Sequence, residues 1–375
     1  MRKVIVLLTA AIILLYTTGI GLAVEGEPEA DNISQIYKAK VIKIKDTIKE
    51  EFQEGNITVI TQIADVKILD KDLKGKVVEV QNSLSGNPAY DVELEEGITV
   101  SITREEGEGG QATFFVAGYE RVSYIFQITG IFLVLLVLIG GWKGIKSIVS
   151  LGITVFLILY IMIPQLLKGM NPILISIIVC ALSTVITMVI IAGWNKKSIS
   201  AMLGTIGGIT VGGSVAYIYG MLSRLTGLGS QEAQMLMYIP QEIQLDFRGL
   251  LFAGILIGAL GAAMDVSISI ASALTELSEK DNSMSFGQIV RHGMNIGKDI
   301  MGTMSNTLIL AYTGGALAMI MLFAAYQRPV NEIINLDFVA TEIIRSVAGS
   351  IGLLFAIPIT AIIFAFLQRK ICKNG

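Results

Sequence analysis

Residues 250–274 read LLFAGILIGALGAAMDVSISIASAL. This run carries a single ionisable side chain, Asp265, among small and large apolar residues. A helix that crosses the hydrocarbon core of a bilayer needs about 20 predominantly apolar residues. The run therefore predicts a membrane-spanning helix over 249–273, and it places a carboxyl group inside that span.

Six further apolar stretches surround this one, at 124–141, 148–167, 172–193, 199–222, 300–325 and 343–367. The composition agrees with them, because 53% of the chain is hydrophobic and 16% is charged, whereas soluble domains carry about 25% charged residues. We therefore expect residues 119–375 to form a seven-helix transmembrane domain. An ordinary cytosolic protein and a disordered protein are both excluded.

The N-terminus has the features of a targeting segment. Arg2 and Lys3 precede an apolar run from Val4 to Tyr16, and Gly21 and Ala23 supply the small residues of a cleavage site. Residues 1–23 are interpreted as a signal peptide or, if they are not cleaved, as an N-terminal anchor helix. Both alternatives send the chain from residue 24 onward out of the cytoplasm.

Basic residues provide an independent test of this orientation, because cytoplasmic loops of membrane proteins carry an excess of Lys and Arg. With residues 24–118 outside, ten basic residues fall in the inside loops and tail, and four fall in the outside loops. The sequence therefore predicts a multi-pass protein of the cell membrane. Residues 24–118 are expected to be extracytoplasmic and the C-terminus, with Cys372, cytoplasmic.

Residues 24–118 are acidic and typical of a β domain. They contain 10 Lys and Arg against 19 Asp and Glu, which does not suit nucleic acid, since phosphate binding needs clustered basic residues. Short runs rich in β-branched residues, bounded by turn residues, lie at 57–69, 75–80, 97–103 and 112–116. We expect a small all-β domain, either a barrel of the OB kind or a sandwich. Seven acids between Asp91 and Glu108 favour a solvated face, with a weak calcium site as the alternative.

Two glycine stripes occur within the expected spans. Small residues at spacings of three and four share one helix face and let another helix approach closely. We interpret these stripes as helix-packing faces, with a pore lining as the alternative for the first of them. The first contains Gly204, Gly208 and Gly212, and the second contains Gly254, Gly258 and Gly261.

Polar side chains at membrane depth are the candidate site. Asp265 continues the second glycine face, and Asn295, Asp299 and Asn306 share one face of the next helix. A charge in hydrocarbon is costly, so such residues face protein or water and are functional candidates. We expect an intramembrane polar site that responds to a cation or a proton, the alternative being hydrogen bonds that only hold helices together.

The sequence contains no HExxH or GxSxG motif and no phosphate-binding loop. We therefore expect no enzymatic activity and predict no catalytic or cofactor-binding residue. Neither a metal nor a cofactor can be named from the sequence.

Several long segments resemble the YibE/F-like bacterial membrane proteins. They are GALGAAMDVSISIASALTEL (258–277), GMNIGKDIMGTMSNTLILAYTGG (293–315), LTGLGSQEAQ (225–234) and DFRGLLFAG (246–254). NSLSGNPAYDV (82–92) is similar to the outer domain of the longer, YibE-type members. The resemblance implies a multi-helix membrane domain and, as a partner, a related membrane protein without the outer domain. It implies no activity.

Two functions remain open. Acidic and amide residues at membrane depth favour a transporter or a permease-like subunit acting in the lipid bilayer. The separate outer domain favours a non-transporting envelope sensor or scaffold.

Overall fold

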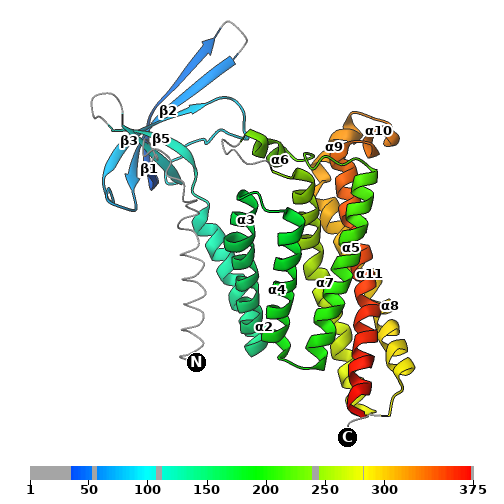
Figure 1. Ribbon diagram of the computed structural model, residues 1–375. Coiled ribbons are helices and arrows are strands. Elements are labelled where there is room, and N and C mark those ends of the chain that lie inside the picture. Colours follow the sequence, from blue (N-terminus) through cyan, green and yellow to red (C-terminus); the bar gives the residue numbers. More distant parts are fainter. Residues whose placement is uncertain (1–34, 53–56, 107–111, 239–244, 282, 373–375) are drawn as a thin grey trace. The chain divides into compact units, whose positions relative to one another are not determined.

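The computed structural model describes residues 35–52, 57–106, 112–238, 245–281 and 283–372 (Figure 1). The expected signal peptide or anchor helix at 1–23 lies outside the described residues. The described chain divides into two compact units, the first ending at Leu135 and the second beginning at Leu136. A small β-barrel followed by mostly apolar helices confirms the expected fold class.

Five strands close the barrel in the order β1-β2-β3-β5-β4, with β4 also pairing with β1. All these pairs are antiparallel except β3 with β5. The longest strand, β1, was not among the strand segments predicted from the sequence. The strands are β1 (Gln35–Phe52), β2 (Ile57–Ile68), β3 (Val77–Leu84), β4 (Thr99–Glu106) and β5 (Ala112–Tyr119).

Alternating side chains fill the barrel. Tyr37, Ala39 and Val41 of β1 are buried, and so are Val66 and Ile68 of β2. Successive side chains of a strand point to opposite faces, so each strand supplies its inward-facing set at every second residue. The interior of a small closed barrel is filled by such side chains.

A buried amide pair fixes the segment between β3 and β4 to the barrel. Gln62 Oε1 accepts hydrogen bonds from the Leu94 backbone N–H at 2.8 Å and from Asn82 Nδ2 at 3.1 Å. Asn82 Nδ2 also donates to the Val92 carbonyl at 2.6 Å. Leu94 itself is a fully buried member of the barrel core. These bonds satisfy polar groups that burial would otherwise leave unpaired.

Helix α2 (Val122–Phe156) is interrupted at Gly141, whose φ of 53° and ψ of −129° are not helical. The chain turns back there, since a Cβ at Gly144 would collide with the Leu136 carbonyl oxygen. The two helical parts on either side of this turn together span Val122–Leu167, which is 46 residues and a summed helix length of roughly 69 Å at about 1.5 Å per residue. That is about twice the ~30 Å hydrocarbon core, so the stretch has room for both expected spans, 124–141 and 148–167.

The second unit is helical. Five helical stretches of the described chain are long and apolar enough to cross a membrane, or six if the bent pair α8 and α9 is one span. The elements after α2 are η1 (Leu157–Met162), α3 (Ile163–Leu167), α4 (Pro172–Ala192), α5 (Lys196–Leu222), α6 (Gln231–Met235), η2 (Leu236–Tyr238), α7 (Phe247–Lys280), α8 (Phe286–Gly315), α9 (Leu317–Ala325), α10 (Val330–Ile334) and α11 (Asp337–Cys372).

Side chains just before the first turn explain where several helices begin. The side chains of Asn171, Asn195 and Asp246 accept backbone N–H bonds at the starts of α4, α5 and α7. Ser285 and Gln288 form a reciprocal capping box at the start of α8. Such caps satisfy N–H groups that have no partner within the helix. The start of α8 is therefore encoded locally, immediately after the link that follows α7.

Helices α5, α7 and α11 form the centre of this unit. Figure 1 shows α5 and α11 side by side along their length, and α5 and α11 each also pack against α7. Helix α4 covers one flank of α7, and α8 packs against both α7 and α11. The buried cores join these helices through residues such as Val266, Ile270 and Leu353. The remaining face of the α7–α8 pair has no helix from the described chain against it, and the candidate site lies there.

Candidate functional site

Asp265 lies on an exposed strip of α7. Its α7 neighbours Val266 and Ala263 are buried, whereas Gly254, Gly261 and Asp265 are exposed. This is the periodicity that a helix shows when one side packs against protein and the other does not. The glycine stripe of α7 and its aspartate therefore share a surface that the described chain leaves open.

The polar residues of α8 are exposed as well. Ile289, Gly293 and Gly297 make the buried face of this helix, and Asn295, Asp299 and Asn306 are exposed. Helix α8 has three buried residues among its 30. Most of its circumference thus faces away from the rest of the described chain.

Two contacts set the register of the antiparallel helices α7 and α8. A Cβ at Gly293 would lie 3.2 Å from Leu274 Cδ1. Near the other end, a Cβ at Gly258 would collide with the Tyr312 hydroxyl. The two contacts lie toward opposite ends of the helix pair, so the register holds along the whole shared length.

Counting along the helices from these contacts puts Asp265 opposite the segment from Gly302 to Ser305. Asp299 and Asn306 lie within one turn of that segment, which is about 3.6 residues. Asn295 lies farther toward the start of α8. The structure therefore brings Asp265, Asp299 and Asn306 to one level, and it leaves Asn295 more than a turn away.

These side chains have no partner in the described residues. Within those residues, Asp265, Asn295, Asp299 and Asn306 form no hydrogen bond or ion pair, with one another or with other groups. The same part of the chain contains no group of three or more His, Cys, Asp or Glu side chains able to hold a metal ion. We call the exposed side of Gly254, Gly261, Asp265, Asp299 and Asn306 the α7–α8 polar face.

The first glycine stripe has a different environment. A Cβ at Gly208 would lie 2.6 Å from the Gly352 carbonyl oxygen, and one at Gly212 would lie 2.8 Å from the Ala348 carbonyl oxygen. A Cβ at Gly204 would collide with Thr360. These three glycines allow the backbones of α5 and α11 to approach closely, as small residues do in membrane helix pairs.

A bend divides the span that was expected over 300–325. Helices α8 and α9 meet at 61°, and α8 ends at Gly315 after the pair Gly314–Gly315. The expectation of one continuous helix there is wrong. Glycine is a poor helix residue, so two in succession provide a place for the helix to end.

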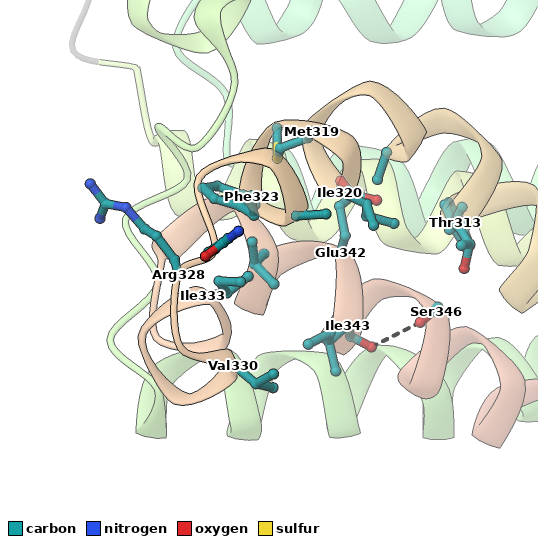
Figure 2. A pocket seen from close by; sticks show the side chains of 15 residues that line it. Thr313, Met319, Ile320, Phe323, Arg328, Val330, Ile333, Glu342, Ile343 and Ser346 are labelled. Atoms are coloured by element: carbon teal, nitrogen blue, oxygen red, sulfur yellow. Dashed lines mark hydrogen bonds between the residues drawn. The ribbon is translucent and has the colours of Figure 1, made fainter.

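The bend opens a cavity of about 540 Å³ between α8, α9, α10 and α11. Figure 2 shows the apolar side chains of Met319, Ile320, Phe323 and Ile333 around it, with Glu342 reaching from α11 toward α9. Volumes of about 300–1,000 Å³ are usual for small-molecule sites. No residue of this cavity was in the site predicted from the sequence. The double glycine was the one available signal for the break that forms it.

Glu342, which lines the cavity, forms an ion pair with Arg345. Glu342 Oε1 accepts a hydrogen bond from Arg345 Nη1 at 2.7 Å. The Arg345 guanidinium also lies 5.9 Å from the centre of the Tyr312 ring, the distance at which a cation is attracted to a ring face. Arg345 thus connects α11 to the last turn of α8, immediately before the bend.

The barrel's acidic segment was also a candidate. Asp91 Oδ1 accepts from the Ser85 backbone N–H at 2.7 Å and from Ser85 Oγ at 2.9 Å, and Oδ2 accepts from the Gly86 N–H at 2.7 Å. The Ser85 backbone N–H, together with the other bonds, holds the pKa of Asp91 below its usual value. Both oxygens of this carboxylate are thus occupied by the chain's own turn.

Comparisons with known proteins agree with this architecture. The family described as YibE/F-like protein matches residues 128–370. The chain belongs to the YibE/F-like family. The YibE/F family N-terminal domain matches residues 32–119, which contain the barrel. This confirms the resemblance to the longer family members with an outer domain. The search of curated proteins and the search of solved structures found no match.

Proposed function

We propose that this YibE/F-like chain is a membrane transporter, and that its α7–α8 polar face lines the path of a cation or proton. The observation that carries the proposal is the position of Asp265. It lies within a helix that is long and apolar enough to cross a membrane, it is exposed, and Asp299 and Asn306 share its level. Ionisable residues inside a membrane span mark ion and proton pathways.

The bend between α8 and α9 supports the same function. Transporters place their binding sites where a spanning helix is interrupted, because the ends of the two half-helices expose backbone groups there. Here the break at Gly315 lies on the helix that carries Asp299 and Asn306. Carboxylate and amide oxygens are the ligands that hard cations prefer. A proton needs only a carboxylate that ionises reversibly.

Ion flux through the purified full-length chain tests this proposal. The chain is reconstituted into liposomes, and uptake of H⁺, Na⁺, K⁺ and Mg²⁺ is followed with trapped fluorescent indicators. Asp265→Asn keeps the shape and hydrogen bonding of the side chain but removes its charge, so flux should fall at least tenfold. Glu279→Gln removes an exposed carboxylate near the end of the same helix and should leave flux unchanged.

Two results would contradict this proposal. One is the absence of flux of all four ions in correctly inserted wild-type protein. The other is full flux in Asp265→Asn. If Asp265 only bonds helices together, Asp265→Asn should stay active while Asp265→Ala reduces the amount of protein in the membrane.

A second candidate function is an envelope sensor or scaffold, and the β1–β2 hairpin favours it. Strand β1 is hydrogen-bonded to β4 and to the two residues just before it only as far as Val41, and β2 pairs with β3 only from Ile60 onward. The outer part of the hairpin therefore has two unpaired edges among the described residues. Unpaired strand edges can accept a strand from another protein. Capture of an extracytoplasmic partner by the barrel, lost when the hairpin is shortened and without ion flux, would favour this candidate.

A further inference from the structure

We propose that a second copy of this chain covers the α7–α8 polar face in the bilayer, with Asp265 of each protomer bonded to Asn306 of the other. Three observations on the described residues support the inference. Polar side chains in an apolar span have no partner, there is open space beside the glycines of the face, and the acceptors of one helix match the donors of the other. The inference concerns assembly and does not depend on transport.

The first observation is the exposure of Asp265 and Asn306 in an apolar span. A carboxylate that faces lipid is costly, and an amide without a partner there loses its hydrogen bonds to water. Within the described residues neither side chain has a partner. A protein surface that supplies the missing partners would remove this cost.

The second observation is the space above the glycines. A Cβ at Gly254, Gly261 or Gly302 would meet no atom within 4 Å, whereas Gly208 and Gly212 are already filled by α11. Close approach of membrane helices requires small residues on the contacting face. The α7–α8 polar face therefore has the shape of a helix-packing seam, and no described residue of the same chain fills that seam.

The third observation is complementarity between the two helices of the face. Asp265 on α7 offers only acceptors when ionised, and Asn306 on α8 offers two N–H donors. Two copies inserted in the same direction are related by a two-fold axis along the membrane normal, and such an axis keeps every residue at its own depth. Asp265 and Asn306 lie within one turn of the same level. The axis therefore places Asp265 of each copy beside Asn306 of the other copy, which gives two equivalent contacts, as in an isologous dimer.

Disulfide trapping between differently tagged copies tests the dimer. Both native cysteines are replaced by alanine in the full-length chain, and the copies are co-expressed and oxidised in native membranes. One copy carries Gly261→Cys and the other Thr307→Cys, which lie at matching levels. A product with both tags and twice the 40.3 kDa mass is expected.

A matched control uses Gly152→Cys in place of Gly261→Cys. Gly152 is also exposed on a spanning helix, and a Cβ there meets no atom within 4 Å, but it lies outside the polar face. Cross-linking with Thr307→Cys should be at least tenfold lower. Equal cross-linking of both pairs, or a product with a protein of another mass, would overturn the proposal.

A charge swap tests the pair itself, with dimer formation measured by energy transfer between labelled copies in liposomes. Asn306→Asp places two carboxylates against each other and should weaken the dimer about tenfold. Adding Asp265→Asn restores one carboxylate and one amide per pair and should recover the dimer. A monomeric wild type, or a double variant no better than Asn306→Asp, would refute the inference. Absence of flux of all four ions in a wild-type protein that does form the dimer would refute only the transport proposal.

Discussion

Gly208 and Gly352 lie in mutual backbone contact. A Cβ at Gly208 would stand 2.6 Å from the Gly352 carbonyl oxygen, and a Cβ at Gly352 would stand 2.9 Å from the Gly208 carbonyl oxygen. Neither position can accept a side chain unless α5 and α11 move apart. The contact holds the two helices at the centre of the second unit together.

Gly208→Ala should therefore destabilise the protein. The added methyl meets backbone atoms that cannot rotate away, and overpacking of this kind costs about 1–3 kcal/mol. Thermal unfolding of the purified chain in detergent should show a lower midpoint. Gly152→Ala is the control, because a Cβ there meets open space. An unchanged midpoint in Gly208→Ala would contradict the α5–α11 contact.

Gly141→Ala should strain the turn in α2. The φ of 53° and ψ of −129° at this residue belong to a region that is nearly restricted to glycine, where other residues cost about 1–3 kcal/mol. Its neighbour supplies the control, since Gly140 has no positive φ and no atom within 4 Å of a Cβ. Thermal stability should fall in Gly141→Ala and stay unchanged in Gly140→Ala. If both variants match the wild type, the chain does not turn at Gly141.

Gln62→Leu should destabilise the barrel, which we expect to fold alone as a fragment of residues 24–121. The substitution leaves the buried Leu94 N–H without its acceptor, and an unsatisfied buried group costs about 1–3 kcal/mol. Urea unfolding followed by circular dichroism measures the effect. The exposed Gln81 on β3 provides the control variant Gln81→Leu, which should unfold like the wild type. A disordered wild-type fragment would show that the barrel needs the rest of the chain.

Acid should release the turn that Asp91 holds. The folded-state pKa of Asp91 is lowered, chiefly by the Ser85 backbone N–H. Its contribution to the free energy of unfolding is therefore present above the ordinary pKa of 3.8 and disappears as pH falls through the lowered value. The urea midpoint of the same fragment should therefore drop more between pH 5 and pH 2, a range of about three units around that pKa, in the wild type than in Asp91→Asn. If the urea midpoints of the two proteins change with pH in the same way, the Asp91 carboxylate contributes nothing to the stability of the barrel.

Cys372 should be accessible only from the cytoplasm. The expectation rests on the basic residues around it and in the inside loops. An impermeant maleimide should label it only after cells are permeabilised. Cys180 is 3% exposed and should not be labelled under either condition. Thr47→Cys, on the exposed side of β1, placed in a Cys372→Ala background, should label in intact cells. The reverse pattern at the two sites would invert the topology.

The amino-acid sequence alone was enough to predict the two kinds of domain. Apolar runs about 20 residues long and β-branched runs between turns are local patterns, so they are visible without a tertiary structure. The same holds for the glycine stripes and for the shared faces of α7 and α8, since helical periodicity determines which residues lie on one side. The turn at Gly141 lies where one predicted span ends, whereas the break at Gly315 was less visible, because a glycine permits a change of direction without requiring one.

The environment of each face was decided by the tertiary structure. Gly208 and Gly254 belong to similar stripes in similar apolar helices, yet one is packed against α11 and the other is open. The predicted polar residues lie on an exposed surface because α7 and α8 pack against each other through Val266, Ile270 and Ile289. Asp265 and Asn306 are on other sides of these helices and are exposed. A helix's periodicity specifies which residues share a side, but the neighbour that covers that side comes from distant parts of the chain, or from another chain.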